Sequence, residues 1–553
     1  MSQYMPPSGR SAVETLPILA ELLRSRAERV PKTLFAIFPD SSISYGDLYA
    51  QASSLAKGLV ASGLPPRGHV AILMPNCLHF LLAHFAVQLA GGISILINAR
   101  SKQQELSYAI PHCDADFLLT TDVIDEHANF TELLAQVYPE LRDVTSAGVL
   151  NLGAAPRLRH IVLFGAKTWP AAASAAELVA IGQRLPASVL DMARLGQHTE
   201  ETAVMIYTSG TTASPKACEL THASIQRSWA VYTRAVNLAE GGKVWDPMPF
   251  FHSGGVGLMT GIMACGATIV SSPHFDPNVI FDLIVRHRIE HLYPGFHLLA
   301  VPLLQSSRYS RAAFKFVRTM VVIGPLGTLR NIQSSLPAHT RVMNLFGMSE
   351  GSGLVTLTPP DAPEEQRLTT SGRASLGVEV RIVAADTGEV LPANSSGEIQ
   401  FRGGGAFHAY FKDVAATHAT ILPEGWVRTG DLGKFDSDGW LYYLGRLKDL
   451  LRIGGENVAT AEIESFLSSH PAVKFVQVIG KPDERLGETA VAFVELNPGL
   501  SLSGQELIEF CTGKIARYKI PTDVIFVTAW PMSSTKIQKF KLRELLLSAG
   551  RGE

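Results

Sequence analysis

The chain has few of the features that mark secreted, metal-stapled or nucleic-acid-binding proteins. It contains five cysteines, an odd number, and no C-x-x-C pair, which indicates a reducing compartment without a disulfide framework or a structural zinc site. Lys and Arg number 48 and Asp and Glu number 50, so the net charge of −2 gives no electrostatic reason to expect a nucleic-acid partner. These shortages favour a cytoplasmic protein that does not bind nucleic acid.

The sequence also lacks an apolar run long enough to span a bilayer. The most apolar stretch, residues 80–97, is interrupted by His84, Gln88 and the pair Gly91-Gly92, whereas a spanning helix needs about 20 nearly uninterrupted apolar residues. The opening MSQYMPPSGRSAVE has no apolar core before a cleavage site. We therefore expect no transmembrane segment and no signal peptide.

Alternating patterns indicate covered parallel sheets in the first part of the chain. In residues 69–98, the strand-like run HVAILM is followed by a helix that opens at Pro75-Asn76, by Gly91-Gly92, and by a second strand, ISILI. Apolar runs separated by helical stretches recur through residues 203–350. Short β-rich runs punctuated by turn residues then replace this pattern.

The last hundred residues form a smaller α/β piece with signals for helix starts. Thr460 is expected to cap a helix, and Ser503 and Glu506 have the spacing of a capping box. The predicted fold class is α/β, with a large N-terminal body of several subdomains, residues 1–446, that contains covered β-sheets and a small β-rich subdomain. Residues 447–553 are expected to form a small, mobile α+β C-terminal domain.

The most informative segment is residues 207–216, YTSGTTASPK, a loop that leaves an apolar strand. Hydroxyls and exposed backbone N–H groups of such a loop can hold phosphate oxygens, and Lys216 adds a positive charge. The loop is not a Walker A loop, because Lys216 has no glycine before it and no Ser/Thr after it. In isolation a solvated Ser/Thr turn is an equal alternative. The candidate phosphate-binding residues are Thr208, Ser209, Gly210, Thr211, Thr212 and Lys216.

This segment resembles the phosphate loop of the adenylate-forming enzymes, which include acyl-CoA synthetases, nonribosomal peptide synthetase adenylation domains and firefly luciferase. The resemblance extends from about residue 40 to residue 543 and is closest to acyl-CoA synthetases. The family usually has glycines where this chain has Ala213 and Ala217. These two changes are expected to stiffen the loop and alter its grip on pyrophosphate.

Further segments resemble the family's nucleotide site. In residues 344–350, NLFGMSE, the resemblance implies that Phe346 stacks on adenine and that the catalytic Glu350 binds Mg²⁺, for which a carboxylate offers hard oxygen ligands. In GWVRTGD it implies that Asp431 accepts hydrogen bonds from both ribose hydroxyls. The resemblance also assigns Gly347, Ser349 and Arg446 to nucleotide binding.

The C-terminal segments resemble the family's moving parts. Lys448 corresponds to the interdomain hinge, Gly455 to the glycine beside the thiol channel, and Lys536 to the catalytic lysine that bridges the attacking carboxylate and the α-phosphate. A plain tight turn is the alternative for Gly455. The glycine that normally precedes the lysine is absent, so Lys539 is the alternative to Lys536.

Residues 249–255, PFFHSGG, resemble the segment that lines the acyl pocket, where His252 lies near the carboxylate or gates the channel. A structural histidine is the alternative. Amino-acid-activating relatives have an aspartate at this position, so its absence argues against an amino acid. Glycines in an apolar setting leave space for a hydrophobic carboxylate. The candidate acyl-pocket residues are Phe251, His252, Gly254, Gly255 and Gly324.

The resemblance implies an ATP-dependent acid–thiol ligase of fatty acid metabolism. A hydrophobic carboxylic acid, a small-molecule substrate, would attack MgATP to give acyl-AMP and pyrophosphate, and coenzyme A would then take the acyl group. A homodimer is left open. The alternatives are a stand-alone adenylation enzyme that loads a separate carrier protein, a luciferase-like oxygenase, and a catalytically weak nucleotide- or acyl-binding homologue. The last is suggested by Ala213, Ala217 and the shortened lysine motif.

Overall fold

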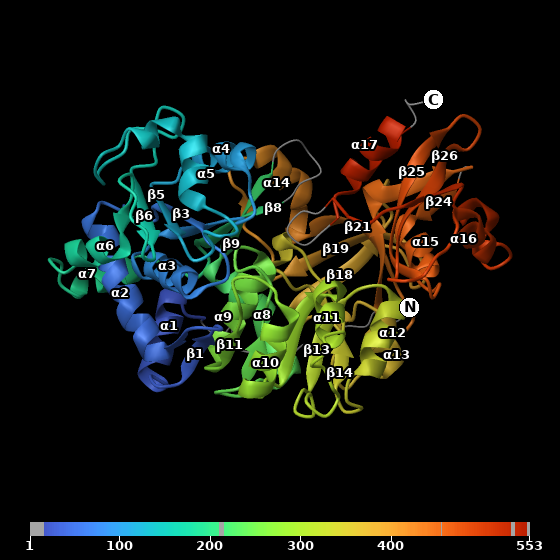
Figure 1. Ribbon diagram of the computed structural model, residues 1–553, viewed down its shortest axis with the longest axis horizontal. Coiled ribbons are helices and arrows are strands. Elements are labelled where there is room, and N and C mark those ends of the chain that lie inside the picture. The colour runs from blue at the N-terminus through green and yellow to red at the C-terminus, as the bar shows by residue number, and fades with distance from the viewer. Residues whose placement is uncertain (1–15, 209–214, 455, 532–536, 550–553) are drawn as a thin grey trace.

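The computed structural model describes residues 16–208, 215–454, 456–531 and 537–549. Its larger part contains two extended sheets that lie next to each other, each covered by helices (Figure 1). The first sheet runs in the order β20-β9-β8-β4-β3-β5-β6-β7, and its central strands pair in parallel. Its strands are β3 His69–Leu73, β4 Ile93–Ile97, β5 Phe117–Thr121, β6 His160–Phe164, β7 Ala173–Ser174, β8 Thr202–Thr208, β9 Lys216–Thr221 and β20 Ala409–Tyr410.

The second sheet runs in the order β14-β13-β12-β10-β11-β1-β2 and is parallel except for the β1–β2 pair. Its strands are β1 Leu34–Ile37, β2 Ser42–Ser44, β10 Lys243–Trp245, β11 Thr268–Val270, β12 His291–Phe296, β13 Thr319–Ile323 and β14 Arg341–Met343. Strands buried on both faces read as continuous apolar runs, which is why the sequence pattern revealed them.

Helices pack on both sheets and fill the space between them. They are α1 Leu19–Arg29, α2 Tyr45–Ala61, α3 Leu78–Leu89, α4 Gln103–His112, α5 Phe130–Val137, α6 Ala175–Gly182, α7 Ser188–Leu195, α8 His222–Ala235, α9 Ser253–Cys265, α10 Pro277–His287, α11 His297–Leu304, α12 Leu326–Ser335 and α13 Glu364–Thr369, with the 3₁₀ turn η1 Pro139–Arg142. No helix in the described ranges is long and apolar enough to cross a membrane.

The expected start of α3 at Pro75-Asn76 is wrong, because the helix begins at Leu78. The side chain of Asn76 instead joins the two sheets. Its amide group donates to the Met248 carbonyl (2.8 Å) and accepts from the Phe250 N–H (2.7 Å). A buried amide with these partners fixes the loop that precedes α9.

Smaller antiparallel sheets follow the second large sheet, as expected for the β-rich region. A three-stranded sheet contains β15 Leu345–Phe346, β16 Thr356–Leu357 and β17 Arg373–Ala374; a four-stranded sheet, in the order β18-β19-β21-β22, contains β18 Val378–Val383, β19 Gly397–Gly403, β21 Val427–Phe435 and β22 Leu441–Arg446. Short helical segments in this region are η2 Ser349–Gly351, α14 Val414–Thr420 and η3 Pro423–Gly425. The predicted α/β fold class is confirmed.

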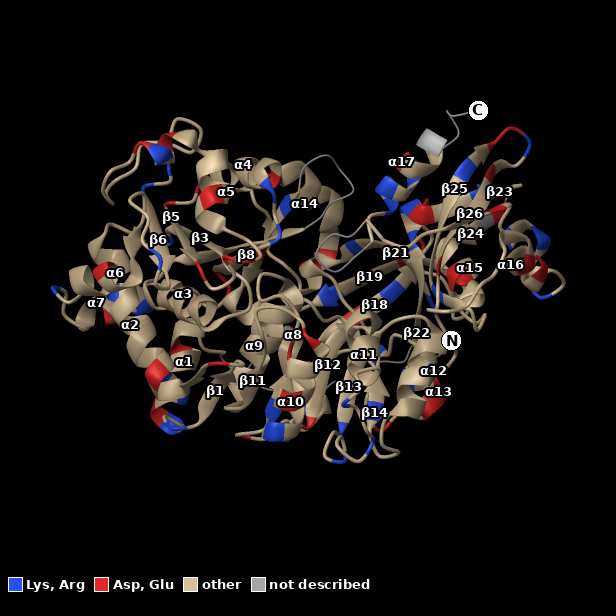
Figure 2. Cartoon of the chain, viewed as in Figure 1, with Lys and Arg blue, Asp and Glu red and all other residues tan. Residues whose placement is uncertain are grey.

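The turn η4 Leu447–Asp449 leads from β22 into a separate C-terminal sheet with its own apolar core. This part, orange to red in Figure 1, lies beside the four-stranded sheet. It contains β23 Leu450–Ile453, β24 Glu456–Ala459, α15 Thr460–Leu467, β25 Val473–Asp483, β26 Gly487–Leu496, α16 Gly504–Cys511, η5 Arg517–Lys519, β27 Asp523–Phe526 and α17 Lys539–Ala549. Acidic and basic residues are interspersed over the whole chain in this view (Figure 2).

Of the two expected helix caps in this part, one is confirmed and one is wrong. The Ser503 hydroxyl accepts from the Glu506 N–H and the Glu506 carboxylate accepts from the Ser503 N–H, which is a capping box. Thr460 is the first residue of α15 and not its cap. Ala459 holds the extended N-cap position, and its side chain cannot accept a hydrogen bond.

Candidate active site

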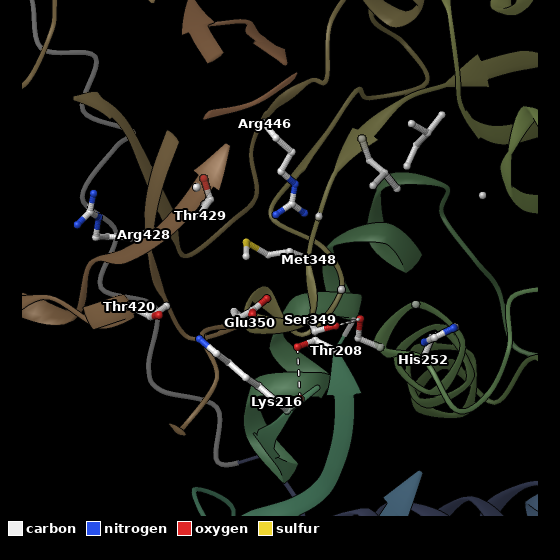
Figure 3. A pocket seen from close by; sticks show the side chains of 18 of the residues that line it. Thr208, Lys216, His252, Met348, Ser349, Glu350, Thr420, Arg428, Thr429 and Arg446 are labelled. Carbon is white, nitrogen blue, oxygen red and sulfur yellow. Dashed lines mark hydrogen bonds between the residues drawn. The ribbon is translucent and has the colours of Figure 1, made fainter. Parts of the chain in front are cut away.

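A cavity of about 560 Å³ lies where the two large sheets, the small sheets and the C-terminal part meet. The β8–β9 hairpin, the start of α9, the ends of β12 and β13, the turn after β15, and the β22–η4 junction all contribute to its wall (Figure 3). The predicted site residues that line it are Thr208, Lys216, His252, Gly254, Gly347, Ser349, Glu350, Arg446 and Lys448. Segments more than 200 residues apart in the chain thus converge on one cavity.

The phosphate-loop prediction falls on the β8–β9 hairpin. Thr208 and Lys216 are opposite partners in the two strands, and the Thr208 hydroxyl donates to the Lys216 carbonyl (3.3 Å). The Lys216 ammonium group lies 4.8 Å from the ring centroid of Tyr410. A cation held over the cavity in this way can attract phosphate oxygens. Ser209, Gly210, Thr211 and Thr212 lie outside the described residues.

Glu350 has a partner that the sequence did not indicate. Its carboxylate is 8% exposed and accepts a hydrogen bond from the Tyr410 hydroxyl at 2.5 Å. Burial and then the adjacent Glu350 carboxylate raise the pKa of Tyr410 above its usual value, so the hydroxyl stays a donor. Tyr410 lies 60 residues from Glu350 and also packs on Phe407. It orients the carboxylate that the sequence assigns to Mg²⁺.

The residues fit a magnesium ion that is held largely by its substrate. Within the described residues no group of three or more His, Cys, Asp or Glu side chains could hold a metal ion alone. Mg²⁺ binds through one or two carboxylates together with substrate phosphates. Glu350, beside the cation Lys216 and fixed by Tyr410, matches that requirement as a single protein ligand.

Asp431 and Arg446 contact each other. They are partners in register on β21 and β22, and Arg446 Nε lies 2.8 Å from Asp431 Oδ1. Asp431 is 2% exposed, while Arg446 lines the cavity. Burial lowers the pKa of Arg446, but the nearby groups of Asp431, Tyr443 and Glu350 have the larger combined effect. The pKa of Arg446 is therefore raised. The pair can present a fixed positive group, and an anchored carboxylate behind it, to a nucleotide.

The predicted adenine-stacking residue is buried. Phe346 is 6% exposed and its ring stacks with Tyr443 at 5.9 Å between centroids and 27° between planes. The next residue, Gly347, has to be a glycine, because a Cβ there would lie 2.0 Å from the Gly353 carbonyl oxygen. Phe346 therefore does not line the cavity directly, whereas Gly347 does.

The acyl-side predictions divide into two groups. His252, at the N-terminal end of α9, and Gly254 line the cavity together with Met248, Tyr293 and Ile323. Phe251 instead lines a second cavity of about 1150 Å³. A Cβ on Gly255 would lie 2.2 Å from the Pro249 carbonyl oxygen, and one on Gly324 would lie 2.9 Å from the His297 ring. Close packing explains Gly255 and Gly324 without an acyl-binding role.

The described C-terminal residues include one of the two candidate lysines. Lys539 Nζ donates to Glu464 (2.7 Å), Thr460 (2.9 Å) and the Val478 carbonyl (3.1 Å), so it is held inside the C-terminal part. An ammonium group with three such partners is structural. Gly455 and Lys536 lie outside the described residues.

Sequence reasoning missed other polar residues of the cavity wall. Arg428 pairs with Glu398, whose carboxylate oxygen lies 3.1 Å from Arg428 Nε, and both line the cavity with Thr429. Glu398 is 2% exposed and also accepts from the Gly430 N–H. The only sequence signal for these residues was the alternation of polar and apolar positions in β19 and β21. That alternation does not show which residues of the two strands lie opposite each other.

Comparison with known proteins extends over nearly the whole chain. The model of the family described as "AMP-binding enzyme" matches residues 23–411, and that of the "AMP-binding enzyme C-terminal domain" matches residues 462–536. The putative acyl-CoA synthetase YngI of Bacillus subtilis (strain 168) is 32% identical, covering 95% of this chain and 96% of the relative. The mitochondrial medium-chain acyl-CoA ligase ACSF2 of Mus musculus is 30% identical over 95% of this chain and 87% of its own length.

Solved structures have the same fold. The ATP-bound MatB from Rhodopseudomonas palustris superposes with a TM-score of 0.81 at 25% identity, covering 95% of this chain and 98% of that one. The anthranilate CoA ligase AuaEII in complex with anthranoyl-AMP gives 0.85 at 24% identity, with 97% and 98% covered. Because the family match extends over more than half of its residues, the chain belongs to the family of AMP-binding enzymes, within the adenylate-forming superfamily.

Proposed function

We propose that the chain joins a hydrophobic carboxylic acid to coenzyme A through an acyl-AMP intermediate. The reaction class follows from the family and its relatives: the chain is an AMP-forming acid–CoA ligase. The ATP-bound structure of MatB supports ATP as the activating substrate. The names of the relatives, an acyl-CoA synthetase and a medium-chain acyl-CoA ligase, support coenzyme A and a hydrophobic acid.

The observation that carries this proposal is that charged and apolar side chains line one and the same cavity. Lys216, Glu350 and Arg446 supply the charged groups. Met248, Tyr293 and Ile323 supply apolar surface near His252. A site that must align a triphosphate with a hydrophobic carboxylate needs both kinds of surface around one reacting centre.

In the first half-reaction the acid's carboxylate oxygen forms a bond to the α-phosphorus, and the bond to the bridging oxygen breaks, releasing pyrophosphate. Lys216 and Arg446 face the cavity and stabilise the negative charge that builds up on the phosphoryl oxygens. Glu350 would hold Mg²⁺, which neutralises the triphosphate when bound. We assign to Lys536 the bridging of carboxylate and α-phosphate, on the resemblance of its segment alone.

In the second half-reaction the thiol sulfur attacks the acyl carbon, the bond to the AMP oxygen breaks, and the thiol proton passes to solvent. The second cavity supports this step, since Phe296 lines both cavities. Arg100, Lys102 and Lys541 border it, and basic side chains suit the phosphates of coenzyme A. We propose that residues 1–446 and 447–553 reorient about Lys448 between the half-reactions, bringing Gly455 to the thiol path.

A two-stage assay tests this proposal. The purified chain is given ATP, Mg²⁺ and a panel of short, medium, long and aromatic acids, and pyrophosphate release is measured first. Coenzyme A or a phosphopantetheinylated carrier protein is then added, and the thioester is identified by mass spectrometry. Acid-dependent pyrophosphate release followed by acyl-CoA is expected. Release followed by transfer to the carrier alone would replace coenzyme A as acceptor, and no release with any acid would reject the proposal.

A further inference from the structure

The acyl side of the cavity ends against three aromatic residues that we call the aromatic plug: Trp229, Tyr232 and Tyr293. Tyr293 lines the cavity, and its ring centroid lies 5.6 Å from that of Trp229 and 5.3 Å from that of Tyr232. Trp229 and Tyr232 are both 0% exposed. The cavity wall at Tyr293 is therefore backed by two further rings.

Small residues on neighbouring elements admit the Trp229 indole. A Cβ on Gly257 of α9 would lie 1.9 Å from Trp229 Nε1, and one on Gly261 would lie 3.0 Å from the Trp229 side chain. A Cβ on Gly353, which lines the cavity, would also meet the indole at 3.0 Å. The indole thus fills the recess between α8, α9 and the turn after η2, directly behind the cavity wall.

A hydrogen bond holds the indole in that recess. Trp229 Nε1 donates to the Ser352 carbonyl at 2.7 Å, and Ser352 has a positive φ of 53°. Moving the ring aside would leave a buried N–H and a buried carbonyl without their partner. The plug is accordingly a fixed wall in this fold.

Polar groups lie behind the plug. Asp246 is 0% exposed, and among the described residues neither its Oδ2 nor the Tyr232 hydroxyl has a hydrogen-bond partner. Burial raises the pKa of Asp246, with the Met248 N–H acting in the opposite direction. A hydrocarbon chain that reached this region would prevent water from satisfying both groups. An apolar tail is therefore disfavoured at Asp246 and the Tyr232 hydroxyl, which leaves the volume of the Trp229 indole as the space that a substitution can open.

We infer that the aromatic plug restricts the acyl group to short and medium chains, and that Trp229 is a specificity-determining residue. This inference rests on the proposed function, because it concerns the acyl side of the same cavity. Trp229 acts by occupying the volume into which a long chain would have to extend. Trp229 does not itself line the cavity that Lys216 and Arg446 border, so it acts through the wall at Tyr293.

Trp229→Ala tests the inference by opening the recess. The ratio of kcat/KM for octanoate to that for palmitate is measured in the wild type and in the variant, with the KM for ATP as a second readout. We expect the wild type to favour octanoate by about tenfold or more, because even one methylene that does not fit a pocket costs about that factor. The variant should move the ratio about tenfold towards palmitate without a change in the KM for ATP.

Two further variants keep the test decisive if the void at Trp229 prevents folding. Trp229→Leu leaves a smaller void and should shift the ratio in the same direction. Gly254→Leu creates no void, since only Met248 Cε lies within 4 Å of its Cβ position, at 3.4 Å. Its side chain would enter the cavity, so activity should move from octanoate towards butyrate.

Trp245→Ala is the matched control. Trp245 is also 0% exposed, but it belongs to the core of the second sheet, and its ring packs on Phe275 instead of on the cavity-lining Tyr293. In Trp245→Ala, the ratio of kcat/KM for octanoate to that for palmitate should stay at the wild-type value. A wild type that activates palmitate as well as octanoate would overturn the inference, as would Trp229 variants with an unchanged ratio. A wild type that activates no acid would reject the proposed function itself.

Discussion

We expect the hydrogen bond from Tyr410 to Glu350 to be needed for fast adenylation. Tyr410→Phe removes one hydroxyl and keeps the ring, so its packing on Phe407 and the approach of Lys216 at 4.8 Å are preserved. The lost interaction is a buried hydrogen bond of 2.5 Å to a carboxylate. Hydrogen bonds to charged groups contribute about 1.5–3 kcal/mol. At 1.4 kcal/mol for each factor of ten, adenylation should slow by about 10- to 150-fold.

The assay is acid-dependent pyrophosphate release as a function of Mg²⁺ concentration. We expect the midpoint of the titration to move to higher Mg²⁺, because the Glu350 carboxylate is no longer oriented. Tyr442→Phe is the control: its hydroxyl donates to Asp436 at 3.3 Å in the four-stranded sheet, away from the cavity. An unchanged rate and midpoint in Tyr410→Phe would refute the claim that Tyr410 positions Glu350.

Three further predictions concern the catalytic lysine, the thiol path and pH. Lys536→Ala should slow acyl-AMP formation by roughly 10²–10³, while thiolysis of supplied acyl-AMP persists. Adenylation at the wild-type rate in this variant would reject Lys536 as the catalytic lysine. Lys539→Ala, which breaks contacts inside the C-terminal part, serves as a stability control. Gly455→Leu should spare single-turnover pyrophosphate release but reduce acyl-CoA formation steeply. A thermal melt distinguishes a blocked thiol path from a strained backbone that destabilises the fold. Equal loss of both half-reactions at an unchanged melting temperature would contradict the assignment of Gly455 to the thiol path. Burial lowers the pKa of His84 to about 3 and of His222, His291 and His297 to about 4, so the folded state keeps them neutral. Their contribution to stability is present above about pH 6.5 and is lost as pH falls towards 4, by about 1.4 kcal/mol per histidine and pH unit. Urea unfolding between pH 7 and 5 measures this slope, which His84→Gln should reduce; a slope of zero would contradict the burial argument.

Local patterns gave the fold class and much of the candidate site. The antiparallel return strand β9 was not predicted, whereas strand β8 and the hydroxyl-rich segment that follows it could be predicted because they are contiguous in sequence. The same holds for the turn of Gly347–Glu350, whose residues the structure brings to one cavity wall. Contiguous segments carry their own turn chemistry, so their position in the fold needs little tertiary information.

Contacts between distant segments could not be predicted from sequence. Tyr410 comes to Glu350 only because β20 pairs with β9 at the edge of the first sheet. Gly255 and Gly324 suggested open space, whereas the structure uses both for close packing that depends on neighbouring elements. Thr460 failed as a cap because the chain enters α15 one residue earlier. For Tyr410 and Gly324 the deciding partner lies in another segment of the chain, whereas Thr460 failed because of a helix boundary shifted by one residue.

In the proposed reaction, the acid's carboxylate attacks the α-phosphorus of ATP in the cavity that Lys216 and Arg446 line. The most direct measurement uses octanoate labelled with oxygen-18 in the carboxylate, with ATP, Mg²⁺ and coenzyme A, and mass analysis of the nucleotide product. Attack at the α-phosphorus leaves one carboxylate oxygen on the nucleotide, so we expect AMP that carries a single oxygen-18 together with octanoyl-CoA. Unlabelled AMP, or ADP with labelled phosphate, would contradict it.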